Sequence, residues 1–331
     1  AETYIASRIL KMTEDRPEPP ARLERYLEEI QQESDIQYAQ KQLEAIRAAA
    51  ENRVVIVTGG PGTGKTTAMA GILKLFDKCK LETMLAAPTG RAAKRLSECA
   101  GRSASTIHRL LEAQFDAESG SICFFHDEDA PLKADVMVVD ETSMVDILLM
   151  QSLLLALPLR CRLVLVGDPD QLPSVGPGNL FSDLIRSGVV PTIRLTEIFR
   201  QARESLIVMN AHAVNHGQLP DLSVKNKDFF FLKRRSAEDV VRTIQELCCS
   251  RLPKNMGIDP VDIQVLSPTR KNEAGTRNLN KQLQAVLNPP GPEKKEKAYG
   301  DFSFREGDRV MQIRNNYDIL WKRLDGLGSG A

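Results

Sequence analysis

The residues best placed to do chemistry lie in a glycine-rich run. Gly59 to Thr66 spell GGPGTGKT, which follows the apolar stretch VVIV and opens a helical pattern at Lys65. Such glycines let backbone N–H groups turn toward a phosphate at a helix N-terminus, while Lys65 can reach the β- and γ-phosphates and the Thr66 hydroxyl can ligate Mg²⁺. A chance glycine-rich turn is the alternative, and the flanking strand and helix argue against it. We expect ATP and Mg²⁺ to be bound by Gly60, Pro61, Gly62, Thr63, Gly64, Lys65, Thr66 and Thr67.

Polar residues also follow two other apolar stretches. VMVVDETSM places Asp140 and Glu141 at the end of a predicted strand. Paired carboxylates there can hold the Mg²⁺ shell and polarise an attacking water, so we assign Asp140 to the metal and Glu141 to the base. The alternative is an idle surface pair. LVLVGDPDQLP presents Gln171, whose amide could hydrogen-bond a γ-phosphate or simply belong to a polar turn.

Two similar loops could hold the phosphates of a nucleic acid. In APTGRAAKRL the residues Pro88, Thr89, Gly90 and Arg91 follow a strand directly, so they would lie at the carboxyl edge of a sheet, where ligands bind. Lys94 and Arg95 fit the solvated face of a helix equally well. SPTRKNEAGTRNLN, which begins with Ser267, Pro268, Thr269 and Arg270, repeats this arrangement after a later strand.

The elements that would carry these residues alternate between short β-branched runs and helical patterns from Arg53 onward. Buried strands separated by helices indicate an α/β fold with a parallel sheet covered on both faces. AQFDAESGSICFFHD interrupts that rhythm and reads as two short strands around a turn at Ser119 and Gly120, a small hairpin insertion within about residues 111–131. A second α/β block follows, with strands expected at Phe229 to Leu232 and Ile263 to Leu266, and helices at Ala237 to Cys249 and Ala274 to Leu287.

These patterns divide the chain into three parts. We expect residues 1–35 to be a linker or the tail of an upstream region, residues 36–204 a first domain that carries the nucleotide site, and residues 205–331 an incomplete second domain. NPPGPEKKEKAYGD, near the end, reads as a polar linker or surface loop.

Composition narrows the class of protein. The 331 residues include 44 basic and 44 acidic side chains, so any contact with nucleic acid must come from local basic clusters. The 6 cysteines have no CxxC spacing, which favours reduced core thiols in a cytoplasmic protein over a zinc site or disulfide framework. We see no membrane-spanning segment or signal peptide in the sequence.

Six motifs, in order, carry a resemblance to a known family: GGPGTGKT, APTGRAAKRL, STIHRLL, VVDETSM, VGDPDQLPSVGPGNLF and LTEIFRQ. Together they resemble superfamily 1 helicases, and most of all the RecD-like branch, from about Gln42 to Asn280. The resemblance implies tandem RecA-like P-loop NTPase domains and ATP-dependent movement from 5′ to 3′ on single-stranded DNA. It also implies contact with a duplex fork and, in some relatives, assembly with other recombination or repair proteins.

The resemblance adds roles for several residues. Gln42, in QKQLEAI, would read the adenine edge, and Gln171 would couple the γ-phosphate to movement. Arg200 matches the family's arginine finger, with Phe199 beside it as a stack for the base; a surface ion pair is the alternative for Arg200. Contacts to DNA would come from the two loops already described and from Thr106, His108 and Arg109, although His108 also suits local packing.

The match to the family is incomplete. Family members continue into a late motif that supplies another arginine and into a small inserted barrel, and we find neither after Trp321.

Three functions therefore remain open. The first is a DNA helicase, the second is a nucleotide-gated binding subunit that unwinds nothing itself, and the third is a nuclease subunit, for which we find no further acidic and lysine cluster.

The hairpin insertion suggests one more hypothesis. It lies between a DNA-contact motif and the carboxylate strand, so we expect it to project from the DNA side as a pin that meets the duplex at the fork. Phe124 and Phe125 could form its apolar tip or flank, or they could only pack the hairpin onto the domain.

Overall fold

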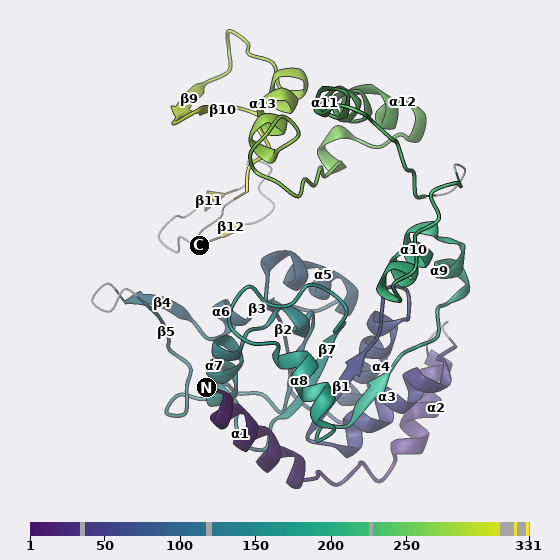
Figure 1. Ribbon diagram of the computed structural model, residues 1–331. Helices are drawn as coiled ribbons and strands as arrows, with labels where there is room; N and C mark the ends of the chain where they lie inside the picture. Colours follow the sequence, from purple (N-terminus) through teal and green to yellow (C-terminus); the bar gives the residue numbers. More distant parts are fainter. Residues whose placement is uncertain (34–36, 117–120, 225–227, 312–320, 323–328, 331) are drawn as a thin grey trace. The chain divides into compact units, whose positions relative to one another are not determined.

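The computed structural model describes the whole chain except residues 34–36, 117–120, 225–227, 312–320, 323–328 and 331. The chain divides into two compact units, Ala1–Phe230 and Phe231–Ala331, which we describe separately (Figure 1). The expected turn at Ser119 and Gly120 lies outside the described residues. No helix in the described ranges has the length and apolarity needed to cross a membrane.

A six-stranded sheet forms the centre of the first unit, in the order β3-β2-β6-β7-β1-β8. Every pairing within it is parallel, which confirms the predicted α/β class. Its strands are β1 (Val54–Thr58), β2 (Thr83–Ala87), β3 (Ser105–Thr106), β6 (Val136–Val139), β7 (Arg162–Gly167) and β8 (Thr192–Arg194).

Apolar clusters lie on both faces of this sheet. Along β1, Val54 and Ile56 belong to one cluster and Val55 and Val57 to the other, because successive side chains of a strand point to opposite faces. Helices α2 (Leu23–Glu33), α3 (Gln40–Glu51), α4 (Lys65–Lys78) and α5 (Gly90–Ala100) contribute to one cluster. Helices α1 (Glu2–Glu14), α7 (Ile147–Ala156) and α8 (Leu180–Ser187) contribute to the other.

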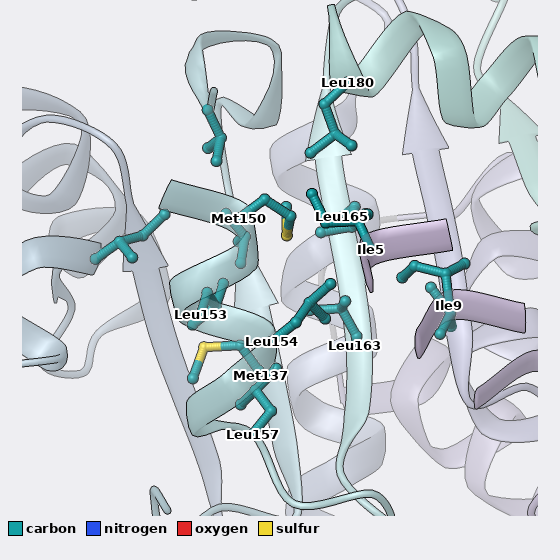
Figure 2. Packing of buried hydrophobic residues seen from close by; sticks show 14 of the residues in the cluster. Ile5, Ile9, Met137, Met150, Leu153, Leu154, Leu157, Leu163, Leu165 and Leu180 are labelled. Atoms are coloured by element: carbon teal, nitrogen blue, oxygen red, sulfur yellow. The ribbon is translucent and has the colours of Figure 1, made fainter. Parts of the chain in front are cut away.

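The N-terminal residues are not the linker or tail that we expected. Ile5, Ile9 and Met12 of α1 are 1–3% exposed, and Figure 2 shows Ile5 next to Leu165 and Ile9 to the right of Leu163, in the same cluster as the leucines of α7. The charged residues of this segment concealed an i, i+4, i+7 apolar stripe, which is the pattern of a helix packed on a core. Burial of three such side chains stabilises the unit by roughly 2 kcal/mol each.

The predicted hairpin insertion is present. Strands β4 (Ala113–Asp116) and β5 (Ser121–Phe124) pair antiparallel, with Ala113 opposite Phe124 at the base. The remaining helices of the first unit are short: α6 (Ile107–Leu110), the 3₁₀ turn η1 (Thr142–Met144), α9 (Arg200–Glu204) and α10 (Leu206–Asn215). The last two pack on the glycine-rich loop, so the first unit extends beyond the boundary expected at residue 205.

The described residues of the second unit do not form the parallel sheet that we expected. Phe229 to Leu232 and Ile263 to Leu266 are not strands, and Phe230, Phe231 and Leu266 are at least half exposed. Two isolated runs make a poor sheet, because about three strands or a covering helix are needed for stability. The described elements are α11 (Ala237–Glu246), a wide turn η2 (Leu247–Arg251), α12 (Leu252–Met256), η3 (Pro260–Asp262), α13 (Thr276–Leu287), the hairpin of β9 (Glu296–Tyr299) and β10 (Phe302–Arg305), and the short pair β11 (Trp321–Lys322) and β12 (Ser329–Gly330).

Candidate functional site

The glycine-rich loop connects β1 to α4, as the sequence predicted. Gly62 and Gly64 have φ of 74° and 81°, a region that favours glycine. A Cβ on Gly64 would also lie 2.3 Å from Nε2 of Gln42 and 2.6 Å from the Phe199 ring. Backbone conformation and close packing therefore both require glycine at position 64.

Lys65 begins α4 and its ammonium lies within the curve of this loop. Nζ donates to the carbonyl oxygens of Gly59 (2.5 Å) and Gly60 (3.1 Å). Burial lowers the pKa of Lys65 by disfavouring the charged form, and nearby carboxylates oppose that shift, Asp168 most strongly. A cation held between loop carbonyls and carboxylates is well placed to meet terminal phosphates.

Asp140 and Glu141 lie at the carboxyl end of β6. Burial raises the pKa of Asp140, while the Glu141 N–H, which donates to its Oδ1 at 2.9 Å, acts in the opposite direction. Burial and the neighbouring Asp140 carboxylate raise the pKa of Glu141. Glu141 also has φ of 51°, and its buried Oε2 has no hydrogen-bond partner in the described structure. Glu141 thus has the properties of a carboxylate prepared to accept a proton.

The donor set suits Mg²⁺ only in combination with phosphate. The Thr66 residue is exposed at the loop and Asp140 supplies a carboxylate, both hard oxygen ligands. Among the described residues no group of three or more His, Cys, Asp or Glu side chains could hold a metal alone. That pattern fits an ion bound by one or two protein oxygens together with nucleotide phosphates and water.

Asp168, to which we gave no role from the sequence, is part of this site. It follows β7, which lies between β6 and β1, and is 2% exposed. Its Oδ2 accepts from Nε2 of Gln171 at 3.4 Å, and its carbonyl accepts the Gln171 N–H at 3.2 Å. These two hydrogen bonds fix the position of Gln171, which the sequence predicted to lie at this site. The sequence did contain a signal for Asp168, because this aspartate directly follows a buried strand, as Asp140 does.

Gln42, which we expected to read the adenine edge, is buried beside the glycine-rich loop. It is 2% exposed on α3, its Oε1 accepts the Ala39 N–H at 2.9 Å, and its Nε2 donates to the Gly64 carbonyl at 3.2 Å. Phe199 contacts the same glycine, so both residues lie at the expected loop. Arg200 begins α9, and its side chain lies outside the described part of the structure.

The two predicted DNA loops of the first unit lie together. Ala87, at the end of β2, pairs with Thr106 of β3, so Pro88 to Arg91 and Thr106 to Arg109 share one sheet edge. Thr89 and Thr106 cap α5 and α6 by accepting the N–H groups of Ala92 (3.3 Å) and Arg109 (3.2 Å). Each hydroxyl keeps its own proton for a phosphate.

Arg91 and Arg109 are exposed beside these threonines, whereas His108 is half-buried. The His108 ring lies 5.9 Å from that of Phe124 at the base of the hairpin, and burial lowers the pKa of His108. In this structure His108 packs locally, which is the alternative that we had kept for it.

The corresponding loop of the second unit, Ser267 to Arg270, precedes α13. Ser267 donates to the Ala274 carbonyl at 2.8 Å and Thr269 to that of Lys271 at 3.0 Å, so these hydroxyls stabilise the loop. Both residues belong to the second unit, and their contribution to a shared DNA track remains a proposal.

Comparison with known proteins decides the family. Residues 42–177 match an AAA domain, and residues 279–320 match the SH3 domain of ATP-dependent RecD-like DNA helicases. The chain is 38% identical to the ATP-dependent RecD2 DNA helicase of Deinococcus radiodurans, over 85% of the chain and 36% of that protein. It is 41% identical to the RecBCD enzyme subunit RecD of Mycolicibacterium smegmatis, over 85% of the chain and 55% of that protein. The chain is a homologue of the RecD-like helicases.

The SH3 match corrects our interpretation of the C-terminal residues. We found no barrel after Trp321 and interpreted NPPGPEKKEKAYGD as a polar linker or surface loop, yet the match at residues 279–320 includes that segment and the β9–β10 hairpin. The Pif1 helicase of Candida albicans, a solved structure, aligns with 66% of the chain and 50% of its own length at 24% identity and a TM-score of 0.42.

Proposed function

We propose that the chain is the ATP-hydrolysing motor part of a 5′-to-3′ DNA helicase that moves on single-stranded DNA. The observation that carries the proposal is the set of charged groups at the carboxyl ends of β1, β6 and β7. There Lys65 interacts electrostatically with three carboxylates, and one of them, Glu141, has a raised pKa and an unpartnered oxygen.

Each residue would contribute one function to hydrolysis. The loop N–H groups and Lys65 would bind and orient the phosphates, and Glu141 would accept the proton of the attacking water. Bound Mg²⁺, held by Thr66 and Asp140, would neutralise charge on the phosphates. Gln171, oriented by Asp168, would respond to the γ-phosphate, and Arg200 would stabilise the charge that develops on it.

The DNA track would be formed by phosphate contacts. Thr89 and Thr106 lie on adjacent loops with exposed arginines nearby, which suits a strand held by its backbone. The loop at Ser267 to Arg270 would give a second grip. Two grips brought together by ATP binding and separated after hydrolysis would produce stepwise movement. The direction of movement rests on the family resemblance.

A second candidate is a nucleotide-gated, DNA-binding subunit of a larger recombination complex. The similarity to the RecBCD enzyme subunit RecD favours it. The chain spans 36% and 55% of the two relatives described above, so unwinding, partner proteins and a cytoplasmic location are parts of the proposal.

Strand displacement separates the two candidates. Two DNA substrates would be compared, each a duplex whose only single-stranded part near the junction is either a 5′ tail or a 3′ tail. Each would be mixed with the chain, ATP and Mg²⁺, and release of the labelled strand would be followed. A helicase of this type releases the strand only from the fork with the 5′ tail, and Lys65→Ala prevents release. ATP-dependent binding without release on either fork would favour the binding subunit.

A further inference from the structure

His212 lies on α10 with its imidazole against the outer side of the phosphate-binding loop. Its Nε2 is 3.1 Å from the carbonyl oxygen of Pro61. A carbonyl oxygen only accepts, so Nε2 carries the proton and donates. The ring also packs closely, since a Cβ on Gly60 would lie 2.7 Å from its Cε1.

The same segment holds the next loop carbonyl. The Phe199 N–H donates to the oxygen of Gly62 at 3.4 Å. A Cβ on Gly62 would lie 2.5 Å from Cβ of Ala202 and 3.3 Å from Cγ1 of Val208. Residues 199–212 therefore cover the loop from Gly60 to Gly62 and hold two successive carbonyl groups on its outer side.

A hydrogen bond that fixes the carbonyl group of one residue also fixes the N–H group of the next residue, because both belong to the same peptide plane. In a trans peptide the C=O of one residue and the N–H of the next point in opposite directions within one plane, and the described chain contains no cis peptide. With the Pro61 oxygen fixed by His212 on the outer side, the Gly62 N–H must point to the inner side. Backbone N–H groups on that side are those that bind phosphate.

The helix that carries His212 is itself fixed. The Asp228 carboxylate accepts the N–H groups of Leu206 (2.7 Å) and Ile207 (3.3 Å) at the start of α10. Two residues before His212, Asn210 exchanges two hydrogen bonds with the backbone of Asp221, of 3.1 and 2.7 Å. His212 thus extends from a rigid support, which a positioning group requires.

We propose that His212 is a positioning residue of the nucleotide site, which orients the Gly62 N–H toward the phosphates through the Pro61 carbonyl. This inference rests on the proposed ATP-binding function. A ring that only filled space beside Gly60 would be replaceable by phenylalanine, whereas a positioning residue requires the N–H donor.

Three variants separate these roles. His212→Phe keeps a ring and removes the donor, His212→Gln restores an amide donor at about the same reach, and His216→Phe makes the same change at an exposed histidine at the end of α10. For each we would measure the Kd of a non-hydrolysable ATP analogue, the KM and kcat for ATP, and the Tm without nucleotide.

We expect His212→Phe to raise Kd and KM about three- to tenfold, the effect of one lost hydrogen bond, with kcat within about twofold and an unchanged Tm. His212→Gln and His216→Phe should both match the wild-type chain within about twofold. If His212→Phe binds the analogue as tightly as wild type, or if His212→Gln is as impaired as His212→Phe, the inference is wrong. If the wild-type chain does not bind the analogue at all, the proposed function fails as well.

Discussion

Glu141 combines a strained backbone, a buried carboxylate and a free oxygen. Its φ of 51° lies in a region that costs a residue with a side chain about 1 kcal/mol or more. Burial and the Asp140 carboxylate raise its pKa. Strain and desolvation at one residue are typical of a functional site, because surrounding structure must sustain both.

Glu141→Gln should therefore leave nucleotide binding intact and remove most hydrolysis. Glutamine has nearly the same shape but cannot take a proton from water, so we expect kcat to fall by about 10²- to 10⁴-fold while the Kd of the ATP analogue changes little. Single-turnover hydrolysis with saturating DNA would measure the effect. A variant that turns over at the wild-type rate would assign the base to another residue.

The individual residues also show what sequence could and could not predict. The structure brings Lys65, Asp140 and Gln171 to one sheet edge, as their positions after buried strands predicted, because the carboxyl ends of neighbouring strands in a parallel sheet meet there; their roles stay predictions. Gln42 and His108 could not be placed, since their partners, Gly64 and Phe124, come from other segments of the chain. Local patterns contain no information on such contacts.

Among the elements, α10 has two side-chain caps at its N-terminus: the Ser205 hydroxyl accepts the Val208 N–H at 3.2 Å, and the Asp228 carboxylate accepts the two N–H groups before it. The Ser205 hydroxyl, and then the N–H groups of Leu206 and Ile207, lower the pKa of Asp228 below its ordinary value. A carboxyl whose folded pKa is lowered contributes stability that is fully present above its unfolded pKa, near pH 4, and is lost as pH falls through the folded pKa.

Amide exchange should report this loss. On acidification below about pH 4, exchange at Leu206 and Ile207 should accelerate relative to the intrinsic rate, while exchange in the central strand β1 should not. Asp228→Asn should show the faster exchange already at neutral pH. Equal protection of α10 at pH 3 and pH 6 would contradict the capping role.

The β4–β5 hairpin is the element that we connect with strand separation. Its base is fixed by the contact of Phe124 with His108, and its exposed surface includes Ile122 and Phe125 at 54% and 55%. None of the candidate nucleotide ligands lies on it. A hairpin that lies next to the proposed DNA contacts and carries no nucleotide ligand suits a pin.

Replacing residues 114–123 by a short glycine-serine turn should therefore separate two activities. We expect ATP hydrolysis stimulated by single-stranded DNA to be retained within about twofold, because Phe124 and the sheet edge stay in place, and unwinding of a forked duplex to be lost. Leu159→Ser, which changes one exposed apolar side chain outside the hairpin, is the control and should unwind the fork at the wild-type rate. Undiminished unwinding by the shortened chain would exclude the pin.

At the scale of the whole molecule, the two units differ in how well sequence predicted them. The first has both faces of its sheet covered, so apolar strands and amphipathic helices gave the correct architecture. At the start of the second unit and within it, FFFL and IQVL have the composition of strands but join no sheet among the described residues, and the β9–β10 hairpin was concealed in charged residues. Strand formation depends on partners, which composition does not reveal.

The cysteines provide a test of the first unit's packing. Cys161 is 1% exposed, and burial raises the pKa of its thiol to about 12. Only about one thiol in 10⁴ would then be ionised at pH 8, so iodoacetamide should not modify Cys161 until the chain unfolds. Peptide mass spectrometry should instead find Cys99 and Cys123 modified in the native chain, since both are exposed. Rapid native modification of Cys161 would contradict the packing of this core.

The central claim is that ATP hydrolysis at Lys65 and Glu141 is coupled to single-stranded DNA. Its most direct test is the steady-state rate of ATP hydrolysis by the chain, measured with Mg²⁺ in the absence and presence of saturating single-stranded DNA. We predict a low basal rate that rises at least about tenfold with DNA, and no hydrolysis above background for Lys65→Ala under either condition. A rate that does not respond to DNA, or a Lys65→Ala variant as active as wild type, would contradict this account.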